Sequence, residues 1–417
     1  MYAVVDCNCF FVSCERVFRP DLNDKPVIVL SNNDGCAVSR SPEAKSLIPM
    51  GGPYWKYRDV LDKHGVQSFS ANFALYGDMS RRVMDVLSYF APDIEPYSID
   101  EAFINLKQLG IKDYQDWGEA VAKRVMQWTG VSVAVGVGST KTRAKAAVTL
   151  AKNQRQSALY LDSDDLLKNL SVDEVWGVGR RLAPRLERMG VRSAFDIIAI
   201  SQAKAQEFAG ITFVRTASEL KGVDCFGGRV QFNEPSKHTL LVSRSFGKTT
   251  HSLSTLELAI ASFSARAAHR LRRQSRVANE VSVFIQTGKH SKHQHQASSR
   301  VPLPYSTADT GSIMTAALKA LKQTYSDDFG YKRAGVLLTG IQHKSDQQLS
   351  LIEQVTEEDM GKKEGLVSAL DALHHKWGRG VVRYGAEGFS KRWHSLRERP
   401  NPAYTTNWRQ IPRVLVG

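Results

Sequence analysis

Short apolar runs alternate with helix-like segments through the first 160 residues of the chain. Residues 2–5 and 26–30 are continuous apolar runs, which are typical of short buried strands. Residues 131–138 predict another strand, which leads into an Ala- and Lys-rich helix over 142–152. Residues 42–48 predict a short helix that begins after Ser41, with Pro42 at its first position. This mixture of strands and helices predicts an α+β or α/β region.

The remainder of the chain divides into further modules. Residues 162–165 predict a linker into a helical region over 164–222. A second mixed module follows, in which Leu256, Ile260, Phe263 and Ala267 lie on one helix face, ahead of a strand over 281–285. Residues 288–300 are rich in His, Ser and Lys and predict a mobile hairpin loop. Beyond residue 343 the chain is polar, which predicts another linker. The pattern as a whole indicates an α+β multidomain protein.

The positive charge of the chain is concentrated in two segments. The 417 residues, roughly two to four domains, carry a net charge of +14. Residues 237–300 hold eleven Lys and Arg against two acids, and residues 376–417 hold nine against two, so the rest is near neutral. This distribution predicts a polyanionic partner, with nucleic acid favoured over an anionic membrane surface. Two solvated basic faces are the alternative.

Cysteine usage and the N-terminus indicate a cytoplasmic protein. The five cysteines include no C-x-x-C pair, so neither a zinc ribbon nor a disulfide framework is predicted. Reduced thiols in a cytosolic protein fit this pattern. An acid interrupts the first apolar run, which argues against a signal peptide. No stretch of 18 apolar residues could span a membrane.

Carboxylates interrupt two apolar strands. Asp6 stands between residues 3–5 and 9–11, and the pair Asp100-Glu101 stands between 97–99 and 102–104. A buried carboxylate costs several kcal/mol unless it is paired or binds a metal, and oxygen ligands favour Mg²⁺. Two Mg²⁺ ions held here could support phosphoryl transfer. Adjacent strand residues face opposite ways, so Asp100 and Glu101 converge only at a hairpin turn or bulge. Strand ends that reach water are the alternative.

A second device for binding phosphate is absent. Residues 136–141 are Gly-rich but lack the spacing of a phosphate-binding P-loop. We therefore attribute Gly136 and Gly138 to the geometry of a strand end.

Several motifs resemble those of Y-family translesion DNA polymerases. Residues 6–11 with Glu15 resemble the first motif of that family, and residues 97–103, Y-S-I-D-E-A-F, resemble the second. Six further segments are similar to the UmuC branch of the family, which includes the catalytic subunit of bacterial DNA polymerase V. They are residues 25–29, 31–36, 43–45, 76–80, 388–393 and 404–406. The likeness covers essentially the whole chain in one collinear order.

The resemblance implies a right-hand polymerase with palm, fingers and thumb, a C-terminal little finger and a basic tail. The palm would comprise residues 1–10 and 71–160, with the fingers inserted at 11–70. The thumb would comprise 161–235 and the little finger 237–343. Residues 344–417 would form a clamp-binding linker and the basic C-terminal tail.

The resemblance also implies roles for individual residues. Asp6, Asp100 and Glu101 would be the catalytic, metal-binding carboxylates, and Cys7 would offer its backbone carbonyl to a metal. Nucleotide binding would fall to four residues: Phe11 as the steric gate against a ribose 2′-OH, Phe10 through its N–H group, and Lys45 and Lys152 at the triphosphate. Core packing for the rings and solvated helix positions for the lysines are the alternatives.

One position departs from the family pattern. Several relatives carry a tyrosine three residues before Lys45, where this chain has Pro42. The UmuC branch commonly lacks that aromatic, so the departure does not argue against activity. It leaves the floor of the nucleotide pocket without an assigned residue.

Two regions are predicted to hold DNA. Residues 175–191 resemble a helix-hairpin-helix, in which Gly177 and Gly179 would bring backbone N–H groups to a phosphate. An ordinary helical hairpin is the alternative. The basic little finger would grip the template duplex, and its assigned residues are Arg244, Lys248, Arg270 and Arg273.

Protein partners are predicted on weaker grounds. Apolar residues in the polar linker resemble the short peptide that docks into the sliding clamp, and they comprise Gln348, Leu349, Leu351 and Ile352. A UmuD′-like accessory dimer and RecA are implied by the resemblance alone.

The function that these features predict is error-prone, template-directed translesion DNA synthesis in the SOS response to DNA damage. The primer 3′-OH would attack the α-phosphate of a dNTP, with two Mg²⁺ ions at the site. One alternative is a non-catalytic DNA-binding subunit of a repair complex, against which the three intact carboxylates weigh. Another is a palm-domain nucleotide cyclase, whose GG[DE]EF-type signature is absent.

Overall fold

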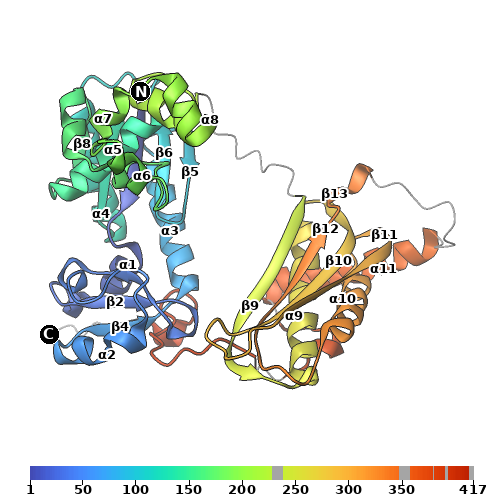
Figure 1. The fold of residues 1–417 in the computed structure, drawn as a ribbon. Helices are drawn as coiled ribbons and strands as arrows, with labels where there is room; N and C mark the ends of the chain where they lie inside the picture. Colours follow the sequence, from blue (N-terminus) through green and yellow to red (C-terminus); the bar gives the residue numbers. More distant parts are fainter. Residues whose placement is uncertain (228–237, 347–356, 379, 390–392, 413–417) are drawn as a thin grey trace. The chain divides into compact units, whose positions relative to one another are not determined.

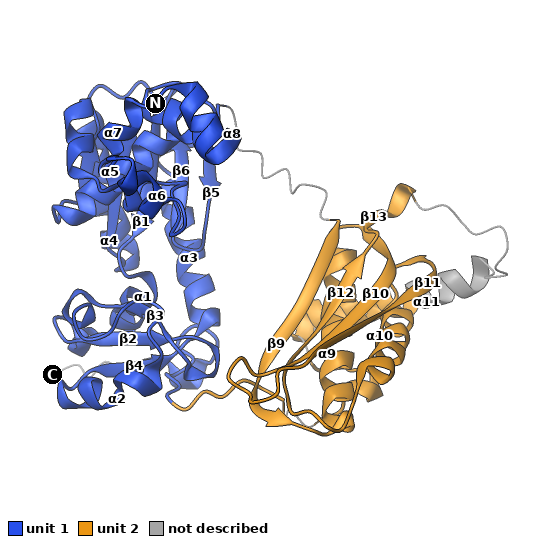
Figure 2. Cartoon of the chain, viewed as in Figure 1, with its two compact units in different colours: residues 1–232, 399–417 blue, residues 233–398 orange. Residues whose placement is uncertain are grey.

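The computed structural model describes residues 1–227, 238–346, 357–378, 380–389 and 393–412 (Figure 1). The chain forms two compact units (Figure 2). Unit 1 comprises Met1–Phe232 with Arg399–Gly417, and unit 2 comprises Asn233–Glu398. Within the described ranges, no helix is long and apolar enough to cross a membrane.

A five-stranded sheet forms the centre of unit 1, in the order β5-β6-β1-β7-β8. Its strands are β1 (Tyr2–Cys7), β5 (Ile94–Pro96), β6 (Glu101–Asn105), β7 (Val133–Gly138) and β8 (Ala158–Tyr160). β1 pairs antiparallel with both β6 and β7, and only its pairing with β6 concerns the site below. The predicted first strand and the predicted strand at 131–138 are both confirmed.

Alternation along β1 assigns its side chains to two apolar clusters, one on each face of the main sheet. Ala3 and Val5 face helices α3 (Phe73–Ser88) and α4 (Tyr114–Thr129) in one apolar cluster. Tyr2 and Val4 face α5 (Lys141–Asn153) in another. Side chains at every second position of a strand share a face, so Asp6 lies on the α5 side. The predicted helix over 142–152 is confirmed as α5.

α5 lies unusually close to the sheet because β7 carries glycines. A Cβ at Gly136 would lie 2.2 Å from the backbone nitrogen of Val148, and one at Gly138 would lie 2.7 Å from that of Ala144. Any side chain at either position would push α5 away. The two glycines therefore allow the close packing of α5 and set its height above the carboxylates. The predicted strand-end geometry fits Gly138, the last residue of β7, but is wrong for Gly136, which lies inside the strand.

A smaller sheet, β3-β2-β4, lies in the segment 11–70. The strands of this sheet and the helices around it are α1 (Phe10–Phe18), η1 (Pro20–Leu22), β2 (Val27–Leu30), η2 (Asn32–Asp34), β3 (Ala37–Arg40), η3 (Pro42–Ala44), α2 (Tyr54–Lys63) and β4 (Gln67–Ser70). The prediction of a helix over 42–48 is wrong in length, because only the 3₁₀ turn η3 forms there. Pro49 and the adjacent glycines 51–52 stop its continuation.

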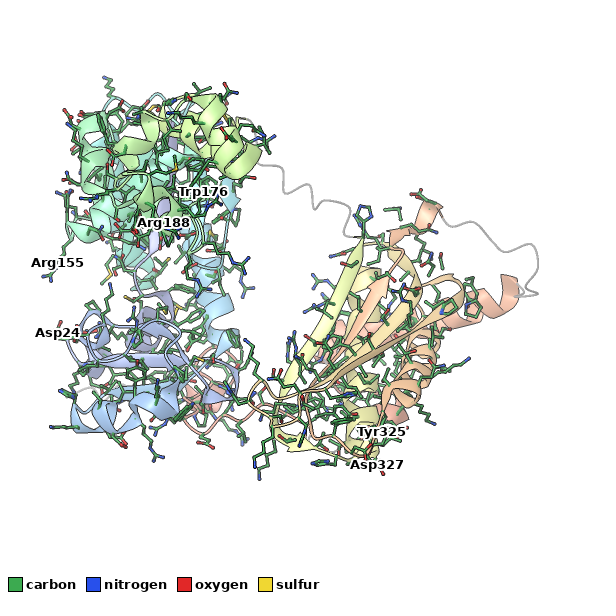
Figure 3. All side chains as sticks on the ribbon, in the orientation of Figure 1. Asp24, Arg155, Trp176, Arg188, Tyr325 and Asp327 are labelled. Carbon is green, nitrogen blue, oxygen red and sulfur yellow. The ribbon has the colours of Figure 1, made fainter. Side chains whose placement is uncertain are left out.

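The helical region packs against the α5 side of the sheet. It contains η4 (Asp164–Asn169), η5 (Val172–Glu174), α6 (Ala183–Arg188), α7 (Ala194–Ile198) and α8 (Gln202–Leu220). Trp176, labelled in Figure 3, joins this region to the β5–β6 hairpin. Its indole N–H donates to the Tyr97 hydroxyl (3.2 Å), and its ring packs against Phe103.

Unit 2 is built on a sheet ordered β11-β10-β12-β9, with β13 paired to β10. Its elements are β9 (Thr239–Thr250), α9 (Leu253–Arg273), β10 (Arg276–Thr287), β11 (Gln296–Thr307), α10 (Thr310–Thr324), β12 (Tyr331–Thr339), β13 (Gln342–His343), η6 (Lys344–Asp346), α11 (Glu357–Trp377) and η7 (Gly385–Glu387). The four apolar residues predicted on one face of α9 are all buried in the core. The prediction of a hairpin loop over 288–300 is wrong beyond residue 295, where the edge strand β11 begins. Its first residues are polar, which hid the strand in the apolar pattern.

α11 docks on unit 2 through a charged cluster. Arg272 of α9 donates two hydrogen bonds to the Asp371 carboxylate (2.7 and 2.9 Å), and His269 Nδ1 lies 3.0 Å from it. Burial alone would raise the pKa of Asp371, but the hydrogen bonds from Arg272 and His269 outweigh burial and lower the pKa to about 2.

Asp371→Asn is expected to reduce the free energy of unfolding of unit 2 by about 1 kcal/mol at neutral pH, because solvent partly screens the lost pair. A carboxyl whose folded-state pKa is depressed stabilises the fold above its unfolded pKa and loses that effect as pH falls. The difference between parent and variant should therefore vanish between about pH 4 and pH 2. Urea unfolding measures it, with Asp327→Asn in an exposed turn as control (Figure 3). Equal losses in both variants would contradict a specific role for Asp371.

Candidate active site

Two of the predicted carboxylates face each other across neighbouring strands. Asp6 of β1 lies directly opposite Glu101 of β6 in the antiparallel register. Directly opposed residues point to the same face, which here is the α5 face. Their side chains are only 15% and 18% exposed, and a side-chain hydrogen bond links them.

Two lysines of α5 neutralise this pair. Lys152 Nζ lies 2.5 Å from Asp6 Oδ1, and Lys145 Nζ lies 2.6 Å from Glu101 Oε1. Seven residues span two helical turns, so both ammonium groups project from one face of α5. Lys152 is a predicted nucleotide-binding residue, and the structure brings it to the carboxylates. Sequence reasoning missed Lys145, although its seven-residue spacing from Lys152 was a usable signal.

The pKa values of Asp6 and Glu101 are shifted in opposite directions. Burial, the largest cause, raises the pKa of Asp6 to about 6 with a further contribution from Glu101, and the charge of Lys152 only partly opposes this rise. Burial also acts to raise the pKa of Glu101, but hydrogen bonds from Asp6 and Lys145 lower it overall. Two neighbouring carboxyl groups on one face offer oxygen ligands that a divalent cation can take.

Asp100 lies at the hairpin turn that sequence analysis required. The N–H groups of Tyr97 and Ser98 both donate to the Glu101 carbonyl (2.9 and 3.1 Å), which closes the turn between β5 and β6. The Asp100 carbonyl accepts the Cys7 N–H (2.9 Å). Burial, followed by the charges of Asp6, Asp100 and Glu101, raises the pKa of the Cys7 thiol.

The Asp100 carboxylate does not join the Asp6–Glu101 pair. Its Oδ1 accepts the Ser98 hydroxyl at 2.5 Å. Within the residues that the structure describes, no three His, Cys, Asp or Glu side chains gather as a ready metal site. The donor set nevertheless fits Mg²⁺, because carboxylate oxygens are the ligands that this ion prefers. The three carboxyl groups and the Cys7 carbonyl are the residues that could hold it.

The two predicted aromatic residues differ in their surroundings. Phe10 is buried (3% exposed) at the start of α1. The Phe11 ring is partly exposed and stacks on Tyr76, with centroids 4.4 Å apart and planes at 16°. The backbone N–H groups of Phe10 and Phe11 belong to the first turn of α1, where N–H groups lack partners within the helix and can bind phosphate.

The other predicted nucleotide and DNA contacts lie on separate elements. Lys45 is exposed after η3. Gly177 has φ of +93°, and a Cβ there would lie 2.6 Å from Thr216 Oγ1, so glycine is required. Gly179 accepts the Leu182 N–H through its carbonyl (2.8 Å) and has open space around its Cα.

The four predicted little-finger residues divide between two elements. Arg244 and Lys248 lie on β9, while Arg270 and Arg273 lie on α9. Arg244 and Arg270 line one cavity of about 320 Å³ in unit 2, whose wall also includes Arg383 and Trp393 of the C-terminal region. The predicted clamp-binding residues Gln348, Leu349, Leu351 and Ile352 lie outside the described residues.

Family comparisons match most of the chain. The impB/mucB/samB family matches residues 5–149, and the impB/mucB/samB family C-terminal domain matches residues 237–351. Residues 364–414 match a domain of unknown function (DUF4113). The two carboxylate segments and the α5 lysines up to Lys145 lie within the first match.

Individual relatives extend over the full length. The chain is 36% identical to protein UmuC of Salmonella typhimurium over 99% of this chain and 100% of that protein. It is 36% identical to protein ImpB of Salmonella typhimurium over 100% of both. DNA polymerase IV of Corynebacterium diphtheriae is 27% identical over 81% of this chain and 74% of its own. The fold is similar to a Y-family DNA polymerase chimera of Dbh and Dpo4, with a TM-score of 0.62 and 18% identity over 82% of this chain and 100% of the chimera.

Proposed function

Because the chain belongs to the impB/mucB/samB family of Y-family DNA polymerases, we propose that Asp6, Asp100 and Glu101 hold two Mg²⁺ ions at its polymerase site. The chain is a DNA-directed DNA polymerase of translesion synthesis in the DNA damage response, and it binds primer–template DNA and dNTP. The names of its relatives argue against the two alternative functions, a nucleotide cyclase and a non-catalytic DNA-binding subunit. The observation that supports the metal assignment is the register of β1 and β6, which places the Asp6 and Glu101 carboxyl groups opposite each other.

The residues around the carboxylates have different proposed roles in nucleotidyl transfer. Bound Mg²⁺ would neutralise charge on the phosphates and activate the attacking hydroxyl. Lys152 and Lys145 keep positive charge beside the carboxylates, and Lys152 is placed to contact the triphosphate. The first-turn N–H groups of α1 offer a further phosphate-binding site. The Phe11 ring blocks a ribose 2′-OH, and Lys45 supplies a further charge for the triphosphate.

The right-hand architecture of the family is present, and we assign its parts as follows. The palm comprises residues 1–10 and 71–160, which supply all five strands of the main sheet. The fingers comprise 11–70 with the small sheet, the thumb 161–235 with α6 to α8, and the little finger 237–343 with the five-stranded sheet of unit 2. Residues 344–417 follow as linker and tail.

The little finger is proposed to hold DNA through phosphate contacts from Arg244, Lys248, Arg270 and Arg273. The logarithm of DNA affinity is then expected to fall linearly with the logarithm of salt concentration, with a slope of about −0.9 for each phosphate neutralised. In Arg244→Ala/Lys248→Ala the slope should become shallower by about 1.8 if each residue contacts one phosphate. Fluorescence anisotropy with a labelled primer–template measures the slope.

The exposed Lys319 of α10 provides the control, since Lys319→Ala should leave the slope unchanged. A parent chain whose affinity does not respond to salt would contradict phosphate-based binding.

Protein partners of the polymerase are also proposed. Gln348, Leu349, Leu351 and Ile352 are the proposed contact to the sliding clamp, and similarity to UmuC supports a UmuD′-like dimer and RecA as accessory proteins. Primer extension on lesion-containing templates, with and without each of these three partners, tests whether they take part in synthesis. Identical synthesis in every combination would contradict their involvement.

A further inference from the structure

A buried carboxyl group lies behind the proposed steric gate. Glu15 of α1, one helical turn after Phe11, is 0% exposed. Desolvation of an unpaired carboxylate would cost several kcal/mol, so its partners matter. The Tyr76 hydroxyl donates to Oε1 (2.6 Å), and the Asn401 side-chain amide donates to Oε2. Asn401 lies 386 residues further along the chain.

The Tyr76 ring connects this carboxyl group to Phe11. Tyr76 of α3 is 0% exposed, and its ring stacks on the Phe11 ring. Burial, followed by the neighbouring Glu15, raises the pKa of Tyr76, so its hydroxyl stays protonated and can donate. Glu15 thus fixes the hydroxyl end of the ring, while the ring face supports Phe11.

Residues 399–404 hold Asn401 in place through contacts on both sides of it. The Ser70 N–H donates to the Arg399 carbonyl (2.9 Å), and the Arg399 N–H donates to the Ser70 hydroxyl (3.0 Å). Tyr404 stacks on Phe18 with ring centroids 4.7 Å apart and planes at 5°. These residues belong to unit 1 (Figure 2) and lie within the match to a domain of unknown function.

We propose that residues 399–404 position Phe11, through Asn401, Glu15 and Tyr76, and thereby set how strictly the polymerase rejects ribonucleotides. The proposal rests on the proposed function, in which Phe11 excludes the ribose 2′-OH. An aromatic gate excludes a hydroxyl only while it cannot retreat, and Tyr76 is the surface that prevents this. Asn401 is a positioning residue, because it acts through Glu15 and Tyr76 and does not touch the nucleotide.

The test compares incorporation of a dNTP and of the matching rNTP opposite the same template base. Asn401→Ala should leave dNTP incorporation near the parent rate and reduce sugar discrimination about tenfold, the effect of losing one hydrogen bond to a charged group. Tyr76→Phe keeps the ring, removes only the hydroxyl and should give a similar loss. Because both variants break one chain of contacts, their combination should lose less than the product of the two effects. Trp408→Ala, at a residue that is 90% exposed in the same C-terminal region, is the control and should match the parent.

Unchanged sugar discrimination in a folded Asn401→Ala chain would overturn the proposal. If Asn401→Ala does not fold, Tyr404→Leu decides, since it removes the stacking on Phe18 that holds residues 399–404 in place and so loosens the Asn401–Glu15 contact, while the side chains of Asn401 and Tyr76 are kept. Lower discrimination supports the proposal, and parental discrimination overturns it. Phe11→Ala separates the two levels. If it relaxes discrimination and Asn401→Ala does not, only the role of residues 399–404 fails, whereas no effect of Phe11→Ala refutes the gate itself.

Discussion

Glu101→Gln and Asp6→Asn are each expected to slow primer extension on the order of a thousandfold or more. Both substitutions keep the size of the side chain and remove the negative charge that would hold Mg²⁺. Metal ions supply several kcal/mol of charge stabilisation in phosphoryl transfer, and each factor of ten in rate corresponds to about 1.4 kcal/mol. Single-turnover extension of a labelled primer measures the loss, and Asp100→Asn should behave in the same way.

Glu119→Gln is the matched control for this loss. Glu119 is an exposed glutamate of α4 in the same unit, and its carboxylate accepts a hydrogen bond from the Gln115 side-chain amide. It should extend primers at the parental rate. Thermal melting of each variant separates a catalytic loss from unfolding. Parental synthesis by folded Glu101→Gln and Asp6→Asn chains would refute the metal assignment.

Phe11→Ala is expected to raise ribonucleotide incorporation relative to dNTP incorporation on the order of a hundredfold. The partly exposed Phe11 ring has the buried Tyr76 ring directly behind it, so removal of the Phe11 ring opens space on the exposed side of Tyr76. Steric exclusion of a hydroxyl is an all-or-none effect of volume, which is why this change should exceed that of Asn401→Ala. The ratio of kcat/KM for dNTP and rNTP measures it.

Trp55→Ala provides the control for the loss of an aromatic ring. Trp55 of α2 is 77% exposed in the same unit, so its removal should not alter sugar discrimination. Equal discrimination in Phe11→Ala and the parent would show that another residue excludes the 2′-OH.

Strong local patterns made much of unit 1 predictable from sequence. Continuous apolar runs mark β1 and β7 because both faces of these strands are covered, and the Ala-rich pattern marks α5 because it packs closely on glycines. The same logic exposes Asp6 and Glu101, since a carboxylate in such a strand needs a partner. Their pairing depends on strand register, which the structure supplies.

The parts that sequence did not reveal depend on distant contacts. The spacing of Lys145 from Lys152 places both on one helix face, but the carboxylate partner of Lys145 is known only once α5 is placed above Glu101. Glu15, Tyr76 and Asn401 come together from three segments, and no local pattern relates position 15 to position 401. The strand β11 was not predicted because an edge strand with polar residues resembles a loop. The helix α11 is anchored by the charged cluster around Asp371, which no local pattern indicates.

The basic tail illustrates the same limit. Its charge suggested one module, yet the structure divides it. Trp393 packs on Phe263 in unit 2, with ring centroids 5.1 Å apart, while residues 399–412 belong to unit 1. Charge alone could not separate residues that bind polyanions from residues that build the polymerase.

The most direct test of the proposed metal centre is a crystal structure with primer–template DNA, a non-hydrolysable dNTP and Mg²⁺. We expect two ions held by Asp6, Asp100 and Glu101, with the Asp100 carboxylate turned away from Ser98 and Lys152 at the triphosphate. Ions bound elsewhere, with Asp6 still paired to Lys152 and Glu101 to Lys145, would contradict the account.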